Sequence, residues 1–444
     1  MIVLKFGGSS VQSAELIKRV VQIAQAALVD APLLVASAMG TTTDTLIKIA
    51  ADATAGNVKR AFKGVENLRR SHITTCRRVA TGTAAGDAEA RLETLFQELS
   101  SLIRGLTLIK ECSPRTRDAI LSFGELLSTT IIAAASTEAG VDTVLLDSRT
   151  LIQTDNTFGA ANVDFEETAR RIAAHVNPQP GTLLVAQGFI AANSGGVTTT
   201  LGRGGSDYTA TIIGAGAGAK RVEIWTDVDG IMTTDPRIIA GAKSIPSISY
   251  EEAAELAYFG ARVVHPSTIQ PAIEAGIPVL VKNTNSPELP GTRIEAGVPG
   301  IGLRAIAGKG DIAVITVRSS RMLNAYGFLS AIFRVFEAHE TPVDLVATSE
   351  VSVSMTVEAK APISRLIKEL SRIGEVSVEE DKGIICLVGR NLWRDGTFVA
   401  RAFTALAGIP VRMISLGSSD INLSMVTAAS DVTEAITRLH GEFF

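Results

Sequence analysis

Cysteine, aromatic residues and long runs of one charge are all scarce in this chain of 444 residues. The three cysteines, Cys76, Cys112 and Cys386, lie far apart and form no CxxC pair, which argues against a disulfide framework and a zinc site. No long run of lysine and arginine occurs and the net charge is −4, so we expect neither nucleic acid nor a membrane as partner. A small-molecule ligand is the class that remains.

Signals for export and for membrane insertion are also missing. The first residues run directly into an apolar segment without a basic leader or a cleavage site, and we find no apolar stretch of about 18 residues. We therefore expect a cytoplasmic protein. A chain of 444 residues exceeds the size at which a single core keeps growing, so two or three domains are expected.

Short apolar runs alternate with longer helical patterns along the first half of the chain. One helix is expected over 14–28, behind Ser13 as N-cap, with a buried face of Leu16, Val20, Ile23 and Ala27. Such alternation predicts an α/β fold, a largely parallel open sheet sandwiched by helices, with ligands at the carboxyl ends of the strands. The expected strands cover 2–6, 33–36, 144–146, 183–186 and 222–225, and the polar clusters at 7–10, 40–44 and 202–206 are expected to converge.

The segment 202–207, Gly-Arg-Gly-Gly-Ser-Asp, is typical of an anion-binding turn before a helix. Glycines let a ligand approach the main chain, and a helix N-terminus presents unpaired N–H groups to negative charge. Arg203 adds a planar fork that suits a carboxylate. An ordinary surface turn would explain the glycines, but it would not explain Arg203 and Asp207 so close together.

A second glycine-containing turn follows the first expected strand. Lys5 at the strand end, with Gly7, Gly8 and Ser9 after it, can aim an ammonium group and backbone N–H groups at phosphate oxygens, although Gly-Gly-Ser is also a common tight turn. The spacing is not that of a Walker loop. The later glycine-alanine stretch 214–220 is interpreted as a small-residue helix packed close to the sheet.

Beyond Pro287 the pattern changes, because prolines and glycines interrupt the chain up to residue 300 and indicate a domain boundary. An internal repeat follows, in which 327–355 is echoed by 396–425 at an offset of about 70 residues. Each copy is expected to form helix, strand, turn and strand.

Five motifs occur in a family order: Lys5 with its glycines, 37–44 (Ser-Ala-Met-Gly-Thr-Thr-Thr-Asp), 122–125 (Ser-Phe-Gly-Glu), the Arg203 turn and 226–230 (Thr-Asp-Val-Asp-Gly). With 259–266 and the doubled C-terminal unit, the chain resembles the aspartate kinases of the amino-acid kinase fold over nearly its whole length. The resemblance implies a catalytic domain over 1–295, followed by an α+β pair of ferredoxin-like ACT domains over 305–380 and 381–444.

The resemblance implies transfer of the γ-phosphoryl group of ATP to the side-chain carboxylate of L-aspartate. Lys5 would be the catalytic lysine, oriented by Asp207. The family pattern places the α-carboxylate of aspartate on Arg203 and its α-ammonium on Glu125. The remaining pocket hydroxyls would come from Ser37, Thr43 and Ser206.

For ATP the resemblance points to Gly7, Gly8, Ser9, Thr226, Asp227, Asp229, Arg237 and Arg262. Mg²⁺ is implied by the ATP chemistry, and we assign it no protein ligand, because phosphates and water can supply much of its shell. Two positions depart from the pattern, since Met232 replaces a tyrosine found in some members and Arg262 replaces a lysine. His265 is interpreted as a packed or capping residue, because the reaction requires no general base.

The C-terminal pair resembles an amino-acid effector module, which predicts feedback inhibition by L-lysine. Threonine, or both amino acids together, stays open, because the segment 324–326 (Asn-Ala-Tyr) departs from the lysine-sensitive type. A homodimer or homotetramer through the ACT domains is expected, since isolated sheet edges would be left unpaired. The effector residues implied are Met322, Ala325, Gly327, Phe328, Leu329, Val343, Asp344, Thr348, Ser349 and Glu350.

Two other functions remain open from the residues alone. A kinase of the same fold could act on glutamate or acetylglutamate, although the motifs at 122–125 and 203–207 disfavour it. A non-catalytic amino-acid sensor could retain the ACT pair, but it would not need Lys5, Glu125, Arg203 and Asp207 together. A purely structural C-terminal pair is the alternative to an effector site.

Overall fold

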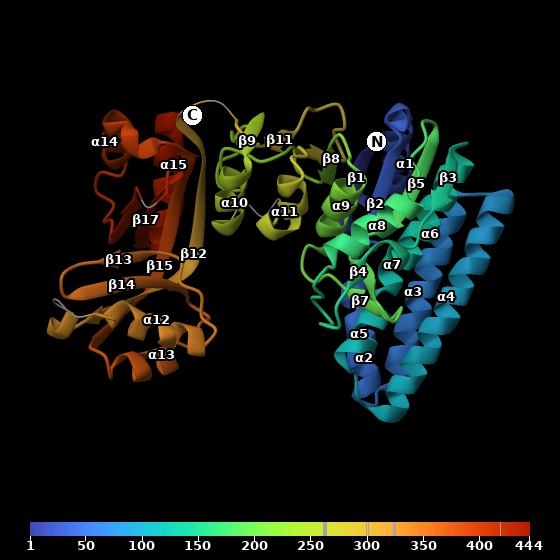
Figure 1. Cartoon of the computed structure of the whole chain (residues 1–444), viewed down its shortest axis with the longest axis horizontal. Helices are drawn as coiled ribbons and strands as arrows, with labels where there is room; N and C mark the ends of the chain where they lie inside the picture. Colours follow the sequence, from blue (N-terminus) through green and yellow to red (C-terminus); the bar gives the residue numbers. More distant parts are fainter. Residues whose placement is uncertain (261–263, 299, 301, 323–325, 418) are drawn as a thin grey trace. The chain divides into compact units, whose positions relative to one another are not determined.

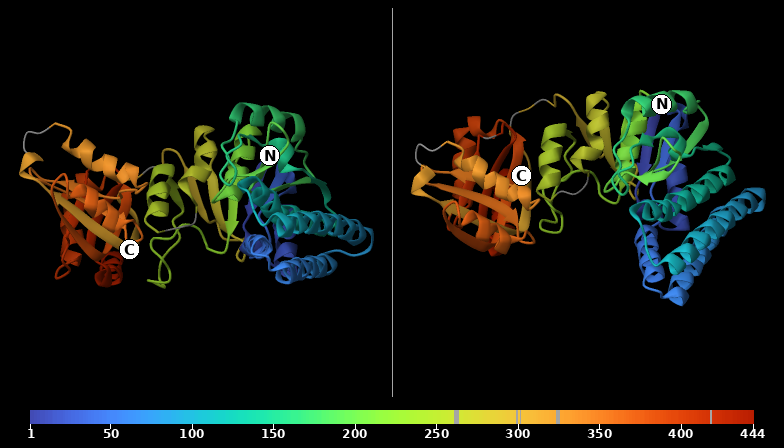
Figure 2. Two further views of the ribbon diagram at one scale, coloured as in Figure 1. Left: turned by 90° about the horizontal axis from the view of Figure 1, so that it is seen from below. Right: turned by 60° about the horizontal axis from the view of Figure 1, so that its bottom comes forward.

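The protein is described by a computed structural model that covers residues 1–260, 264–298, 300, 302–322, 326–417 and 419–444 (Figure 1; Figure 2). These residues form two compact units that interleave along the chain. The first unit contains Met1–Ile231 and Val264–Gly297, and the second contains Met232–Val263 and Val298–Phe444. The segment Met232–Val263 therefore groups with the C-terminal region, which the simple boundary expected near residue 295 did not anticipate.

A largely parallel sheet forms the centre of the first unit, in the order β3-β5-β2-β1-β8-β10-β11. Neighbouring strands are parallel up to β10, and only β11 runs antiparallel to its neighbour within this set. Every residue of β1 and β2 is buried, which explains their continuous apolar sequences. The fold class expected from the sequence is confirmed. The strands are β1 (Ile2–Phe6), β2 (Pro32–Ala36), β3 (Asp142–Leu145), β5 (Thr182–Gln187), β8 (Val222–Thr226), β10 (Val279–Asn283) and β11 (Thr292–Glu295).

Helices cover both faces of this sheet (Figure 1). One hydrophobic core joins alternate residues of β1 and β2 to the helices α1 to α6. On the other face α9 lies against β1 and β8, near α8 and α11. The helices are α1 (Ala14–Ala26), α2 (Thr42–Thr54), α3 (Val58–Val79), α4 (Gly82–Ile109), α5 (Pro114–Leu121), α6 (Phe123–Glu138), α7 (Ser148–Leu151), α8 (Phe165–His175), α9 (Gly205–Gly216) and α11 (Pro266–Glu274).

The glycine-alanine stretch 214–220, expected to be a helix, is helical only up to Gly216, where α9 ends, and its remaining residues form the turn that follows. A Cβ at Gly214 would lie only 2.7 Å from Cγ2 of Val222, so glycine allows the helix to approach the sheet closely. In α1 the expected Ser13 cap is present, because its hydroxyl accepts a hydrogen bond from the Leu16 backbone N–H. The expected buried face is slightly wrong. Its centre is Ile17, Val20, Val21 and Ala24, while Leu16, Ile23 and Ala27 are only partly buried at its margins.

A smaller sheet of β4 (Gln153–Thr154), β6 (Ile190–Asn193) and β7 (Thr198–Thr200) belongs to the first unit. Strands β6 and β7 form a hairpin, and β7 leads directly into the glycine-rich turn before α9. The hairpin therefore places the turn 202–206 near the carboxyl end of β1 in the larger sheet.

The second unit contains an antiparallel sheet in the order β13-β14-β12-β15-β17-β16. The internal repeat is confirmed, because α12, β13 and β14 recur as α14, β16 and β17, each copy with its own hydrophobic core. The elements are β12 (Gly302–Arg318), α12 (Phe328–Ala338), β13 (Val346–Thr348), β14 (Ser352–Glu358), α13 (Ile363–Leu370), β15 (Glu375–Arg390), α14 (Gly396–Ala405), β16 (Met413–Leu416), β17 (Asn422–Ala428) and α15 (Val432–Phe443), with β9 (Ser247–Ser249) and α10 (Tyr250–Tyr258) from the interleaved segment.

One helical run among the described residues, Pro114–Glu138, is long and apolar enough to cross a membrane by composition. The expectation that no such stretch exists is therefore wrong. Within this run 89% of the most apolar window is buried inside the protein, so it serves as the core of the helical layer formed by α5 and α6.

The packing of α4 gives a prediction for stability. Leu99 is fully buried in the core, whereas Leu108 on the same helix is 78% exposed. Leu99→Ala should lower the free energy of unfolding by about 2–5 kcal/mol, because it removes buried methyl groups and leaves a cavity. Leu108→Ala should change it by less than about 0.5 kcal/mol. Urea unfolding followed by circular dichroism measures both, and equal losses would contradict the assigned orientation of α4.

Candidate functional site

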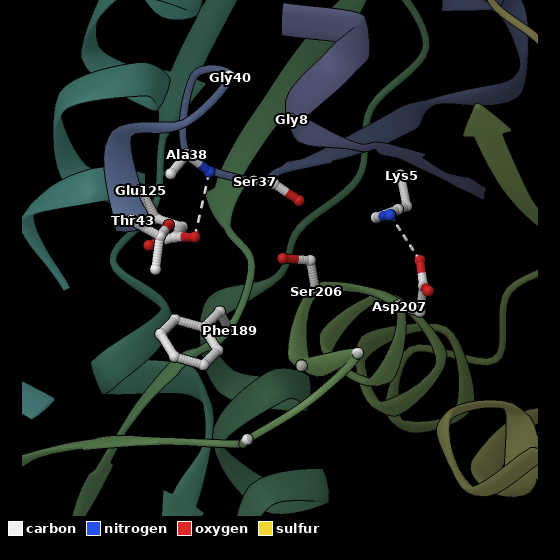
Figure 3. A pocket seen from close by; sticks show the side chains of 13 residues that line it. Lys5, Gly8, Ser37, Ala38, Gly40, Thr43, Glu125, Phe189, Ser206 and Asp207 are labelled. Atoms are coloured by element: carbon white, nitrogen blue, oxygen red, sulfur yellow. Dashed lines mark hydrogen bonds and ion pairs between the residues drawn. The ribbon is translucent and has the colours of Figure 1, made fainter. Parts of the chain in front are cut away.

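A pocket of about 290 Å³ lies where β1 and β2 end in the first unit. Five segments supply its walls (Figure 3). They are the end of β1 with the turn that follows it, the turn after β2 with the start of α2, the first turn of α6, the connection between β5 and β6, and the turn that begins α9. Polar clusters that are far apart in the sequence therefore converge, as expected for the carboxyl ends of a parallel sheet. The lining residues are Lys5, Gly8, Ser37, Ala38, Gly40, Thr43, Glu125, Phe189, Gly202, Gly204, Gly205, Ser206 and Asp207.

An ion pair joins Lys5 to Asp207 at one end of the pocket. Nζ of Lys5 lies 2.6 Å from Oδ1 of Asp207, and the two side chains are only 11% and 15% exposed. Lys5 comes from β1 and Asp207 from the first turn of α9, where a carboxylate is stabilised by the helix dipole. The ammonium group has three donors, so it can bind this carboxylate and still face an anion in the pocket.

The start of α9 provides the backbone of the same wall. Gly202 and Gly204 adopt positive φ angles of 74° and 71°, which turn the chain from β7 into the helix. A Cβ on Gly188 would lie 2.5 Å from Oγ of Ser206, so a glycine at 188 makes room for that serine. The sequence reasoning missed Gly188, because only the crossing of two distant segments explains its lack of a side chain.

A buried carboxyl group, Glu125, lies at the other end of the pocket. Oε1 accepts a hydrogen bond of 3.1 Å from the Ala38 backbone N–H. Oε2 is buried and has no hydrogen-bond partner among the described residues. Burial raises the pKa of Glu125 to about 8, because a charged carboxylate loses its hydration there. A cation in the pocket would supply the missing partner.

The turn after β2 is packed directly on α6. A Cβ on Gly124 would lie 2.7 Å from Cβ of Ala38, and the Ser128 hydroxyl donates a hydrogen bond of 2.8 Å to the carbonyl oxygen of Ser37. The hydroxyl groups of Ser37 and Ser206 lie in the space between Lys5 and Glu125 (Figure 3). The pocket therefore holds hydroxyl groups between a cation at one end and a carboxyl group at the other.

Arg203 is placed differently from its neighbours. Gly202 and Gly204 line the pocket, but the side chain of Arg203 is exposed and is not among the lining residues. A long side chain at the rim can turn inward to meet a carboxylate, and its contribution to the site remains a prediction.

Two family models and several known proteins are similar to this chain. Residues 1–283 match the model of the amino acid kinase family, and residues 385–443 match an ACT domain model. Aspartokinase 1, chloroplastic, of Arabidopsis thaliana is 36% identical over 462 residues, which cover 100% of this chain and 80% of that protein. Lysine-sensitive aspartokinase 3 of Escherichia coli is 34% identical, with 100% and 99% of the two chains covered.

The chain belongs to the aspartokinase family. Two crystal structures of E. coli aspartokinase III each match it with a TM-score of 0.82 and 33% identity, covering 100% of this chain and 99% of theirs. One holds aspartate and ADP in the R-state, and the other holds lysine and aspartate in the T-state. The protein is therefore an ATP-dependent phosphotransferase of this family.

The nucleotide residues expected of an aspartokinase fall into several groups. Gly7, Gly8 and Ser9 follow β1, and the carbonyl oxygen of Gly8 accepts a hydrogen bond of 3.0 Å from the Gly40 backbone N–H. A Cβ on Gly8 would lie 3.0 Å from the carbonyl oxygen of Ala38, so the two turns touch through their backbones.

Thr226 is the last residue of β8, and Asp227 and Asp229 lie in the loop that follows it. Two residues at the end of β10 hold this loop, and the sequence reasoning missed both. Asn283 donates a hydrogen bond of 2.5 Å from Nδ2 to Oδ1 of Asp229, and the Thr284 backbone N–H donates one of 2.8 Å to the carbonyl oxygen of Thr226. These two residues meet the loop because β10 pairs with β8, and this pairing is visible only in the fold.

The two arginines expected to contact ATP do not belong to the described part of the first unit. Arg237 lies in the second unit, where its guanidinium is 86% exposed and pairs with Asp235 at 2.6 Å. Arg262 lies outside the described residues. His265 occupies the N-cap position of α11, and its Nδ1 is 2.8 Å from the Ser267 hydroxyl.

The effector residues expected of an aspartokinase lie in the second unit, except for Ala325, which falls outside the described residues. Gly327 is the N-cap of α12, with a φ of 79°, and Phe328 and Leu329 begin that helix. The backbone N–H of Ser319 donates a hydrogen bond of 2.8 Å to the carbonyl oxygen of Val351. This bond holds the short helix ending at Met322 beside the exposed residues Thr348, at the end of β13, and Ser349 and Glu350, which follow it.

Asp344 is already engaged by the protein itself, while the nearby Val343 packs against the core of the first repeat. The Asp344 side chain is 2% exposed; Tyr258 donates a hydrogen bond to it, and Nζ of Lys309 lies 3.4 Å away. Lys309 also stacks over the Tyr258 ring at 4.9 Å. These partners come from distant segments, so the sequence did not reveal them.

The residues that the structure describes include no group of three or more histidines, cysteines, aspartates and glutamates arranged to hold a metal ion. The part of the chain that is described thus offers no carboxylate cage for Mg²⁺.

The buried carboxyl group predicts a titration near neutral pH. With its pKa raised to about 8, Glu125 is protonated at pH 7 in the free protein and loses its proton as the pH rises through that value. Infrared spectra of the free protein between pH 7 and about 9 should show the carbonyl band of a carboxylic acid decreasing. Glu125→Gln should lack this band, and Glu15→Gln on the exposed face of α1 should keep it. Absence of the band from the wild-type protein at pH 7 would contradict the assignment.

Proposed function

We propose that this protein transfers the γ-phosphoryl group of ATP to the side-chain carboxylate of L-aspartate. The product is 4-phospho-L-aspartate, and the reaction is the first step of lysine, threonine and methionine synthesis. One observation carries the proposal: a single pocket combines the shielded Lys5–Asp207 pair with the unpartnered carboxyl oxygen of Glu125. A small molecule that bears both anionic and ammonium groups complements these two ends.

The reaction needs positioning more than proton transfer. The side-chain carboxylate of aspartate has a pKa near 4, so it is already an ionised nucleophile at neutral pH. The barrier lies in bringing it against the negative charge of ATP. Lys5 neutralises charge on the transferring phosphoryl group, and Asp207 holds the Lys5 ammonium in place. The open N–H groups at the start of α9 add further positive potential.

Selection of an amino acid requires both its α-ammonium group and its α-carboxylate group to be bound. Glu125 accepts the α-ammonium group, which converts its unpartnered oxygen into one member of an ion pair. Arg203 turns in from the rim to bind the α-carboxylate through its planar fork. The hydroxyl groups of Ser37, Thr43 and Ser206 complete the polar wall. The complex of the E. coli relative with aspartate and ADP supports aspartate as the amino acid that is bound.

The nucleotide is assigned to the turn of Gly7, Gly8 and Ser9 and to the loop of Thr226, Asp227 and Asp229, with Arg237 and Arg262 as further contacts. Both the turn and the loop follow neighbouring parallel strands, β1 and β8. Mg²⁺ would be held by phosphate oxygens and water, since the described residues offer it no carboxylate cage. When bound, the ion would neutralise phosphate charge.

The decisive test traps the acyl phosphate product. Purified protein with ATP, Mg²⁺ and aspartate should form a hydroxamate with hydroxylamine, while glutamate should give a much lower rate. Lys5→Ala should lower the rate by at least about 100-fold, because it removes the charge that stabilises the transferring phosphoryl group. Lys18→Ala, on the exposed face of α1, should keep the wild-type rate.

Each contrary result has a defined meaning. A higher rate with glutamate than with aspartate would show that glutamate, and not aspartate, is the phosphoryl acceptor. No hydroxamate from folded protein with either amino acid would favour a non-catalytic amino-acid sensor.

We further propose feedback inhibition by L-lysine at the first repeat of the second unit, with threonine as the alternative effector. The lysine complex of the E. coli relative in its T-state supports lysine. The proposed site comprises the start of α12, Asp344 and the turn of Thr348, Ser349 and Glu350. A cytoplasmic homodimer or homotetramer through the ACT region remains part of the proposal, because β13 and β16 are the outer strands of the sheet.

Inhibition is tested by titrating lysine and threonine separately against the kinase rate. Lysine should inhibit, and Glu350→Gln should raise the concentration needed for half inhibition, because it removes a carboxylate that faces the effector's ammonium groups. Glu380→Gln on β15 serves as the exposed carboxylate control and should leave the titration unchanged. Inhibition by threonine alone would reassign the effector, and inhibition by neither would contradict regulation.

A further inference from the structure

Asp118 is a fully engaged, buried carboxylate that does not line the pocket. It lies in α5, is 1% exposed, and accepts three hydrogen bonds of 2.9 Å. Oδ2 accepts from the backbone N–H groups of Gly159 and Thr200, and Oδ1 accepts from the Thr200 hydroxyl. No cation among the described residues forms an ion pair with it. A buried charge without a cation is costly, so these donors are required to keep it there.

The donors belong to the two segments that support the glycine-rich turn before α9. Thr200 ends β7, three residues before Arg203, and its carbonyl oxygen accepts a hydrogen bond of 2.9 Å from the Ala161 backbone N–H. A Cβ on Gly202 would lie 3.2 Å from Cβ of Ala160 and from the carbonyl oxygen of Gly159. The turn therefore rests directly on the segment 159–161, which Asp118 holds to β7.

The same residue is tied to the helix that carries Glu125. The carbonyl oxygen of Asp118 accepts a hydrogen bond of 3.0 Å from the Ser122 backbone N–H, at the junction of α5 and α6. Glu125 lies in the first turn of α6, three residues further on. Asp118 thus connects two parts of the site. Its side chain binds the segments that support the turn of Arg203 and Ser206, and its backbone belongs to the helical run that leads to Glu125.

We propose that Asp118 is a positioning residue that sets the separation between Glu125 and the turn 202–206. This inference rests on the proposed function, in which Glu125 and Arg203 bind opposite ends of the amino acid. Lys5 and Gly8 are carried by β1 and its following turn, to which Asp118 makes no hydrogen bond. A change at Asp118 therefore acts on the affinity for aspartate more than on the affinity for ATP.

Steady-state kinetics of Asp118→Asn test the proposal. The amide cannot accept on both atoms, so at least one donor loses its partner and the KM for aspartate should rise about tenfold. The KM for ATP should stay within about twofold of the wild-type value. Asp155→Asn is the matched control, because Asp155 accepts hydrogen bonds from Thr157 and Asn162 in the same loop and none from β7.

A second pair of variants guards against a general loss of structure. Thr200→Val removes the hydroxyl donor to Asp118, whereas Thr200→Ser keeps it. The first should raise the KM for aspartate, and the second should retain the wild-type value, which a merely destabilising effect would not produce. Thermal unfolding of all variants accompanies the kinetics, and the Thr200 pair decides the matter if Asp118→Asn does not fold.

Several outcomes would overturn the inference. These are an unchanged KM for aspartate in folded Asp118→Asn, an equal rise in both KM values, an equal effect of Asp155→Asn, or equal kinetics of the two Thr200 variants. Failure of the proposed function looks different, because the wild-type protein itself would then form no phosphorylated aspartate.

Discussion

The ion pair between Lys5 and Asp207 is the contact around which the first unit is organised. It requires the end of β1 to meet the first turn of α9, and α9 reaches that position only because Gly214 allows close packing on Val222. The positive φ angles of Gly202 and Gly204 turn the chain into the helix at the right place. Shielding from water strengthens the attraction between the two charges.

The opposite end of the pocket follows a different physical principle. Glu125 is placed where water cannot hydrate it, with one oxygen satisfied by Ala38 and the other left without a partner. Its raised pKa is the energetic consequence. A ligand cation beside Oε2 would stabilise the charged carboxylate, whose burial the protein has already completed before the ligand binds. Asp118 shows the contrasting case of a buried carboxylate whose three donors are already in place.

Much of the fold was predictable because it depends on local pattern. Buried strands such as β1 and β2 have continuous apolar sequences, and the C-terminal repeat is visible as a recurring order of residue types. The motifs around Lys5, Glu125 and Arg203 were recognisable for the same reason. The face of α1 was predicted less well, because Ile17 and Ala24 are buried according to the position of neighbouring helices. The interleaving of Met232–Val263 with the C-terminal region had no local signal.

By itself, the sequence determined the fold class, the doubled C-terminal unit and the residue types of the pocket, because each depends on short-range periodicity or on contiguous motifs. Only the tertiary structure decided which side chains meet. It placed Asn283 on Asp229 and placed Tyr258 and Lys309 on Asp344, and it left the side chain of Arg203 exposed and outside the set of pocket-lining residues. These contacts join residues that are far apart in the chain, and their geometry follows from strand order and helix packing rather than from any local preference.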